Sequence, residues 1–224
     1  SSGNPMIYFS SALSSYRWLW VNRFQVLKLM IPVILVISLT SFISDNAAIF
    51  GIYLFGFWLV SSCMVRLHRF ILLDESSVSY LSKPNKKDFI YLGIWFFVTF
   101  IENSLDGVIT SIATSYPFAA LPLLLFSSVI GIYIFSRIYM IFPSISVGKN
   151  LSFAWGLTIK KGRVPEVVFS LLILLTPWLA CLSILFIFFN PPTFATFIIF
   201  FLYLCILNAH YSLLFKSFTI RRDK

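Results

Sequence analysis

Two carboxyl groups, Glu102 and Asp106, stand one helical turn apart in a long, nearly uncharged stretch. A helix that starts near Phe89 places Glu102 about 20 Å into a hydrocarbon core about 30 Å thick. A carboxyl at that depth keeps its proton unless a cation or water reaches it. With Asn103 as a neighbouring oxygen donor, this group could bind a proton or a cation from the outer side. The alternative is that the span ends near Ile101 and both acids face outer water.

The two histidines offer less chemistry. His210, with Asn208, stands near the inner end of the last apolar run, and His68 falls in a basic linker. A proton relay through His210 needs a second titratable group within hydrogen-bond reach. The alternative is structural, because polar side chains hydrogen-bond between membrane helices for about 1 kcal/mol each.

Motifs of the common catalytic and cofactor-binding types do not occur in the sequence. It has no P-loop, no Gly-x-Ser-x-Gly motif, and no histidine or cysteine spacing suited to a metal. Cys63, Cys181 and Cys205 are dispersed within apolar runs, as is typical of buried thiols. We therefore expect no enzymatic activity, no cofactor and no metal site.

The elements that must position these residues follow from composition. Of 224 residues, 59% are hydrophobic and 11% are charged, and 26 are phenylalanine. Soluble domains carry about 25% charged residues, so water is not the solvent of most of this surface. The composition excludes a disordered chain, a nucleic-acid-binding module and a disulfide scaffold. It predicts an all-α polytopic membrane protein with a single integral membrane domain over residues 1–224.

Uncharged runs predict six transmembrane helices. A helix that crosses the hydrocarbon core needs about 20 apolar residues. Six stretches approach that length, at residues 24–43, 47–65, 89–108, 118–136, 167–189 and 193–215. Short outer loops and longer inner linkers arrange these spans as three hairpins.

The basic residues predict the orientation of these spans. All 17 lysines and arginines fall before the first span, after the last one, or in the two long linkers, with Lys28 just inside the first span. Positive charge is retained on the cytoplasmic side. We therefore expect both termini in the cytoplasm, with no secretory signal peptide. The retention of basic residues on one side also accounts for the net charge of +9, so this charge does not indicate nucleic-acid binding.

The same basic residues predict contact with anionic headgroups on the cytoplasmic face. A specific headgroup site could be formed by the cations that flank the two long linkers: Arg66, Arg69, Lys160, Lys161 and Arg163. The alternative is ordinary anchoring to the leaflet. Residues 8–23 and 150–161 mix aromatic and basic side chains, which is typical of interfacial helices. We expect the two long linkers to pack together as a cytoplasmic cap, with Asp74 and Glu75 paired to its cations.

Two cytoplasmic segments carry a family resemblance. Residues 66–75 read RLHRFILLDE, and the second segment contains Arg137, Phe142-Pro143, Gly148, Ala154-Trp155 and Thr158. Together they resemble a family of uncharacterised six-span bacterial inner-membrane proteins, in which glycine often occupies the position of Asp74. The resemblance implies a helical bundle in the bacterial cytoplasmic membrane and transfers no catalytic residue.

These observations leave two hypotheses of function. In the first, the chain is a non-enzymatic accessory or envelope protein that acts through lipids or a membrane-protein partner. In the second, it is a small-solute or ion transporter, or the membrane subunit of one, with Glu102 as its intramembrane polar site. A water-filled cavity that converges on Glu102 would favour transport.

Overall fold

The computed structural model describes residues 5–39, 43, 46–75, 85–116, 118, 122–123, 131, 138–150, 152–153, 164–189 and 193–220. Within this part of the chain the regular structure is helical. The helices are α1 (Pro5–Val21), α2 (Arg23–Leu39), α3 (Asn46–Leu73), α4 (Lys86–Ser115), the short α6 (Ile141–Ser146), α8 (Val164–Phe189) and α9 (Thr193–Ile220). The all-α fold class is therefore confirmed.

Four of these helices are long and apolar enough to cross a membrane: α3, α4, α8 and α9. The bent pair α1 and α2 adds a fifth if it counts as one span. The predicted spans 47–65, 89–108, 167–189 and 193–215 fall within α3, α4, α8 and α9 respectively, and most of span 24–43 lies in α2. Most of the predicted span 118–136 lies outside the described residues.

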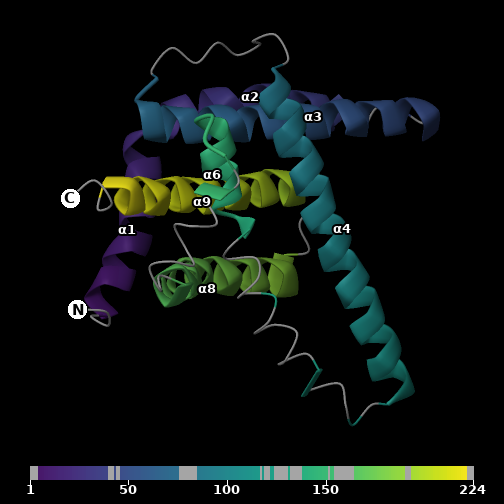
Figure 1. Ribbon diagram of the computed structural model, residues 1–224. Coiled ribbons are helices and arrows are strands. Elements are labelled where there is room, and N and C mark those ends of the chain that lie inside the picture. Colours follow the sequence, from purple (N-terminus) through teal and green to yellow (C-terminus); the bar gives the residue numbers. More distant parts are fainter. Residues whose placement is uncertain are drawn as a thin grey trace.

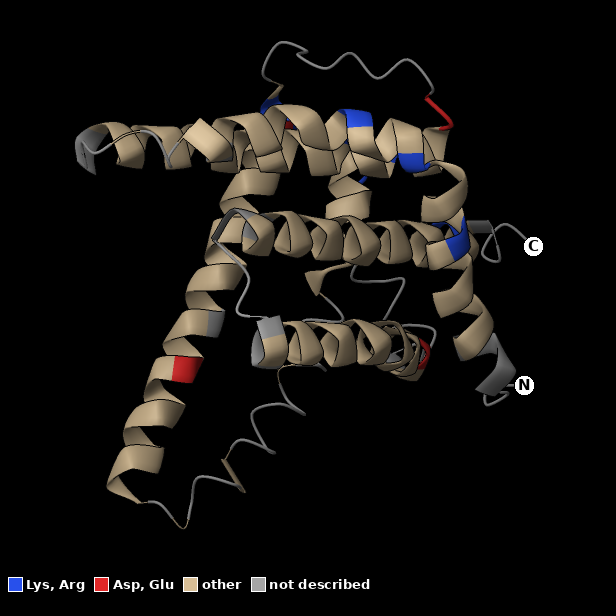
Figure 2. Ribbon diagram, turned by 180° about the vertical axis from the view of Figure 1, so that it is seen from behind, with Lys and Arg blue, Asp and Glu red and all other residues tan. Residues whose placement is uncertain are grey.

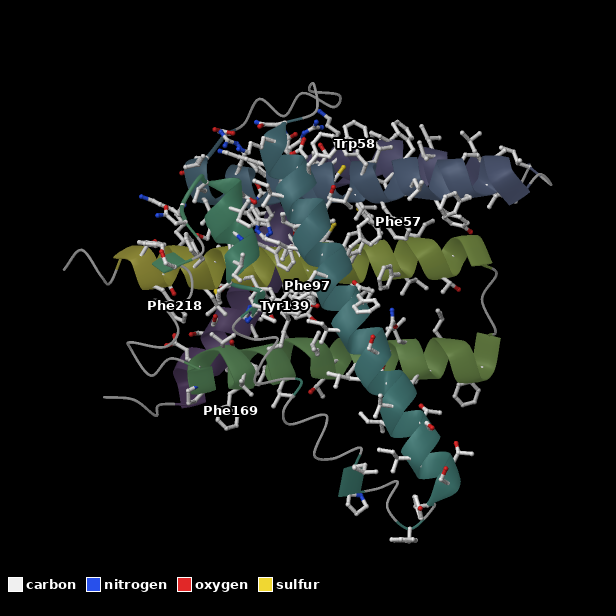
Figure 3. All side chains as sticks on the ribbon, turned by 45° about the vertical axis from the view of Figure 1, so that its right-hand side comes forward. Phe57, Trp58, Phe97, Tyr139, Phe169 and Phe218 are labelled. Atoms are coloured by element: carbon white, nitrogen blue, oxygen red, sulfur yellow. The ribbon has the colours of Figure 1, made fainter. Side chains whose placement is uncertain are left out.

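The long helices are arranged around α3 and α9. Helices α2, α3, α8 and α9 run roughly parallel, whereas α4 crosses α3 steeply and extends away from the bundle (Figure 1). Helix α9 contacts α1, α2, α3, α6 and α8, and α3 contacts α2, α4, α6 and α9. Phe218 of α9 is completely buried, whereas Phe97 of α4 and Phe169 of α8 lie on outer faces (Figure 3).

Helix α1 is a separate element that crosses the ends of α8 and α9. Its axis bends by 77° from that of α2, with the break at Asn22. Ala12 and Ser15 form its buried face, and such small side chains allow a close approach of helices. At the junction of α1 and α2, the guanidinium of Arg23 lies 4.9 Å from the ring centres of both Trp20 and Phe24. An aromatic and basic exposed face of this kind is typical of a helix at the headgroup level.

The helix ends carry clear sequence signals. Asn85 and Asp88 form a capping box at the start of α4. After α6, the amides of Gly148 and Lys149 bond back to the carbonyls of Ile145 and Ser144, which is the pattern of a Schellman motif. Gly148 has φ +78° there, and Asp74 has φ +53° just after α3. Glycine is favoured at such a φ, so Asp74 holds a backbone conformation that side chains rarely adopt.

Basic side chains gather at one end of the bundle. Figure 2 shows most of the lysines and arginines toward the ends of the helices near both termini, those at the start of α4 beside the middle of α3, and none along the far half of α4. Arg69 of α3 also donates to the carbonyl of Ser146 at the end of α6. The segment after the second predicted span therefore packs against the linker that follows the fourth.

Candidate functional site

The first buried polar cluster joins α3, α4 and α9. His68 has no exposed surface, and its Nδ1 lies 2.6 Å from Ser212 Oγ and its Nε2 lies 3.3 Å from the Tyr91 hydroxyl. That hydroxyl donates to Asn208 Oδ1 over 2.8 Å. The Ser212 hydroxyl also donates to the backbone carbonyl of Asn208 over 3.0 Å. A neutral imidazole has one donor and one acceptor nitrogen, so His68 donates to one of the two hydroxyls and accepts from the other. A chain of hydrogen bonds thus runs from Ser212 through His68 and Tyr91 to Asn208.

The expected location of His68 in a basic linker is wrong. Helix α3 does not end near residue 65 but continues to Leu73, and this extension carries His68 into the core. The extension is stabilised by partners on other elements. Arg69 binds Glu75 and the carbonyl of Ser146, and Lys216 of α9 donates to the carbonyl of Ile71.

The second buried cluster joins α1, α8 and α9 through His210. Its Nδ1 lies 2.9 Å from Ser15 Oγ of α1, and its Nε2 lies 3.0 Å from Ser170 Oγ of α8. All three residues have no exposed surface. A neutral imidazole has one donor and one acceptor nitrogen, so one serine accepts from His210 and the other donates to it. His210 therefore holds α1 and α8 against α9.

A serine hydrogen-bonded to a histidine is also the arrangement of a catalytic nucleophile and its base, but catalysis requires that a substrate can reach the serine. Ser15, Ser170 and His210 are fully buried, and none of them lines a cavity described below. Within the described residues no carboxylate bonds to His210 to orient it. This geometry favours the structural interpretation of His210 over the proton relay.

The helix that carries Glu102 is longer than the sequence predicts. Helix α4 continues unbroken through Glu102 to Ser115, so it does not end near Ile101. Its 30 residues extend about 45 Å, more than the hydrocarbon thickness. Asn103 and Asp106 are exposed, and the side chain of Glu102 lies outside the described residues. The structure therefore neither joins these three groups into a site nor separates them.

The predicted headgroup site is described in part. Arg69 forms an ion pair with Glu75, as the sequence predicts for the acidic pair of that linker, and Asp74 lies 3.7 Å from Lys216. Arg66 is half-buried on α3. Lys160, Lys161 and Arg163, and most of the predicted interfacial helix 150–161, lie outside the described residues.

Several cavities are lined by described residues, and three of them bear on function. A small inner cavity of about 30 Å³, room for a single water, touches Tyr91 and Asn208. An apolar groove of about 90 Å³ continues from it between α3, α4 and α9, past Phe57, Trp95 and Phe200. The third, which we call the basic pocket, measures about 470 Å³ and is lined by Leu72, Val147, Lys149, Phe153, Phe215 and Lys216. None of the three includes Asn103 or Asp106.

Both buried clusters and the basic pocket were absent from the sequence-based predictions. Their members are far apart along the chain, so no local motif marks them. A local signal does mark Asp88, which belongs to neither cluster, because Asn85 and Asp88 have the spacing of a capping box. Asp88 is buried and lies 3.4 Å from the Ser62 hydroxyl.

Among the described residues, no group of three or more histidine, cysteine, aspartate or glutamate side chains is placed to hold a metal ion. Comparison of the chain with protein-family models, curated proteins and solved structures gives no match. The family resemblance of residues 66–75 therefore stays a prediction.

We expect His210→Leu to lower the free energy of unfolding by about 2 kcal/mol, since two hydrogen bonds between helices are lost at about 1 kcal/mol each. Thermal unfolding in detergent measures this change. In a double-mutant cycle with Ser170→Ala, the two effects should fall short of additivity by about 1 kcal/mol. Thr176→Ala is the control, because this exposed hydroxyl of α8 bonds only within its own helix. Full additivity with Ser170→Ala would contradict the role of His210 as the connection to α8.

Proposed function

We propose that this chain is a non-enzymatic multi-pass protein that acts by binding membrane lipids or another membrane protein. The observation that supports this is the use of both histidines as buried connections between helices. The two imidazole groups, which are the side chains best suited to acid–base chemistry, are thus engaged in hydrogen bonds between helices. The largest described cavity, in contrast, opens at the basic end and combines two lysines with apolar walls.

The proposal includes six spans in three hairpins, with both termini on the cytoplasmic side of a bacterial inner membrane. The four to five helices of spanning length support it. So does the gathering of lysine and arginine at the end of the bundle near both termini (Figure 2). The positive-inside rule assigns that end to the cytoplasm.

Cysteine labelling tests this orientation. Lys86→Cys and Ser111→Cys place thiols at exposed positions near opposite ends of α4. In intact cells a membrane-impermeant maleimide should label Ser111→Cys, and it should label Lys86→Cys only after permeabilisation. The unsubstituted chain reports the reactivity of its three natural cysteines. Labelling of Lys86→Cys in intact cells would contradict this orientation and show the opposite one.

Retention of lipid tests the function itself. Native mass spectrometry after extraction in mild detergent should show anionic phospholipid bound to the chain in preference to zwitterionic lipid. Glu102→Gln should retain the same lipid, and vesicles that contain either protein should be no more permeable to protons and cations than empty vesicles. Transport that is present in the unsubstituted protein and lost in Glu102→Gln would establish the transporter hypothesis instead.

A further inference from the structure

The basic pocket lies where two spanning helices end. The candidate spans in α3 and α9 end at Leu73 and Thr219, and both residues line the pocket. The turn after α6 closes a further side through Val147 and Lys149. A cavity at the end of two spans lies at the level of the lipid headgroups when the bundle crosses a membrane.

Its two cations differ in how they are held. The ammonium of Lys216 donates to the carbonyl of Ile71 over 3.1 Å and lies 3.7 Å from Asp74. Lys149 is exposed, and its ammonium lies 5.5 Å from the ring centre of Phe153. Neither of the ion pairs formed between described residues involves Lys149. The pocket therefore contains one positioned ammonium and a second that forms no ion pair with any acidic group among the described residues.

The remaining walls are apolar. Phe153 and Phe215 lie with ring centres 6.1 Å apart, and Leu72 and Leu73 complete the lining on the α3 side. A bare inorganic anion loses its hydration shell when it enters such a pocket, and it has no apolar part to bury against the walls. An anion attached to a hydrocarbon group uses both features. The volume of about 470 Å³ also exceeds what a single phosphate group needs and lies in the usual range of small-molecule sites.

We propose that the basic pocket binds the phosphate of an anionic phospholipid between Lys149 and Lys216, with the glycerol and upper acyl atoms against Phe153 and Phe215. This inference rests on the proposed lipid-binding function and assigns it to one site. Asp74 competes with the phosphate for Lys216, so it limits the affinity of the site.

Native mass spectrometry of the full chain, titrated with phosphatidylglycerol in detergent, tests the assignment. Lys149→Gln combined with Lys216→Gln should weaken binding roughly tenfold or more, since each lysine near a headgroup contributes about 1 kcal/mol. Lys86→Gln is the matched control, because it removes one exposed lysine outside the pocket, and it should change binding less than about twofold. Asp74→Asn should tighten binding, since asparagine tolerates the positive φ of this position while removing the competing charge.

Each outcome has a separate meaning. Loss of binding in the double variant, with unchanged thermal unfolding and a normal Lys86→Gln protein, supports the pocket. Binding by the double variant equal to that of the unsubstituted chain overturns the pocket but leaves the proposed function standing. No preference of the unsubstituted chain for phosphatidylglycerol over phosphatidylcholine overturns the function as well. Displacement of the lipid by equimolar inorganic phosphate would show a site for free phosphate and overturn the lipid assignment.

Discussion

The fold depends on the cost of an unpaired polar group in an apolar environment. In hydrocarbon a polar group without a hydrogen bond costs several kcal/mol. The backbone meets this constraint by forming helices, and the buried histidines meet it through hydroxyl groups on other helices. Helix α9 carries Asn208, His210 and Ser212 within two turns, and each of them is buried against another helix. This concentration of polar groups makes α9 the centre of the bundle.

The two clusters also explain why the basic end is the well-packed end. His68 and His210 draw α3, α4, α1 and α8 toward α9, and Arg69 and Lys216 add bonds to backbone carbonyls nearby. Hydrophobic burial gives little preference between helix partners in lipid, because lipid tails are as apolar as leucine. Specific hydrogen bonds and close contacts therefore decide which helices meet. None of the described side chains in the far half of α4 is buried, and most are exposed.

The sequence was sufficient to predict the class of fold and the position of most spans. Long uncharged runs admit few other structures, and five of the six predicted spans lie within or largely within observed helices. The ends of those helices were harder to predict. Treating charge as a sign of a linker ended the second span at residue 65, whereas α3 carries Arg66, His68 and Arg69 as helical residues with protein partners. A charged or polar residue marks the end of a span only when water, rather than another helix, satisfies it.

The two buried clusters and the basic pocket could not be predicted, because the residues that form each of them are distant in the sequence. Ser15 and His210 are separated by 195 positions, His68 and Ser212 by 144, and Tyr91 and Asn208 by 117. A single sequence shows that His210 needs a partner but not which one. Lys149 and Lys216 likewise share a pocket only because the turn after α6 packs beside α9.

Disulfide cross-linking between α1 and α9 tests most directly the arrangement on which the account depends, in which Ser15 of α1 faces His210 of α9. The native side chains at these positions are in contact, with Ser15 Oγ 2.9 Å from His210 Nδ1, whereas the neighbouring Ser14 is exposed. In membranes, mild oxidation should cross-link the Ser15→Cys, His210→Cys protein rapidly and leave the Ser14→Cys, His210→Cys protein uncross-linked. Equal cross-linking of the two pairs, or none in either, would contradict the packing of α1 on α9 described here.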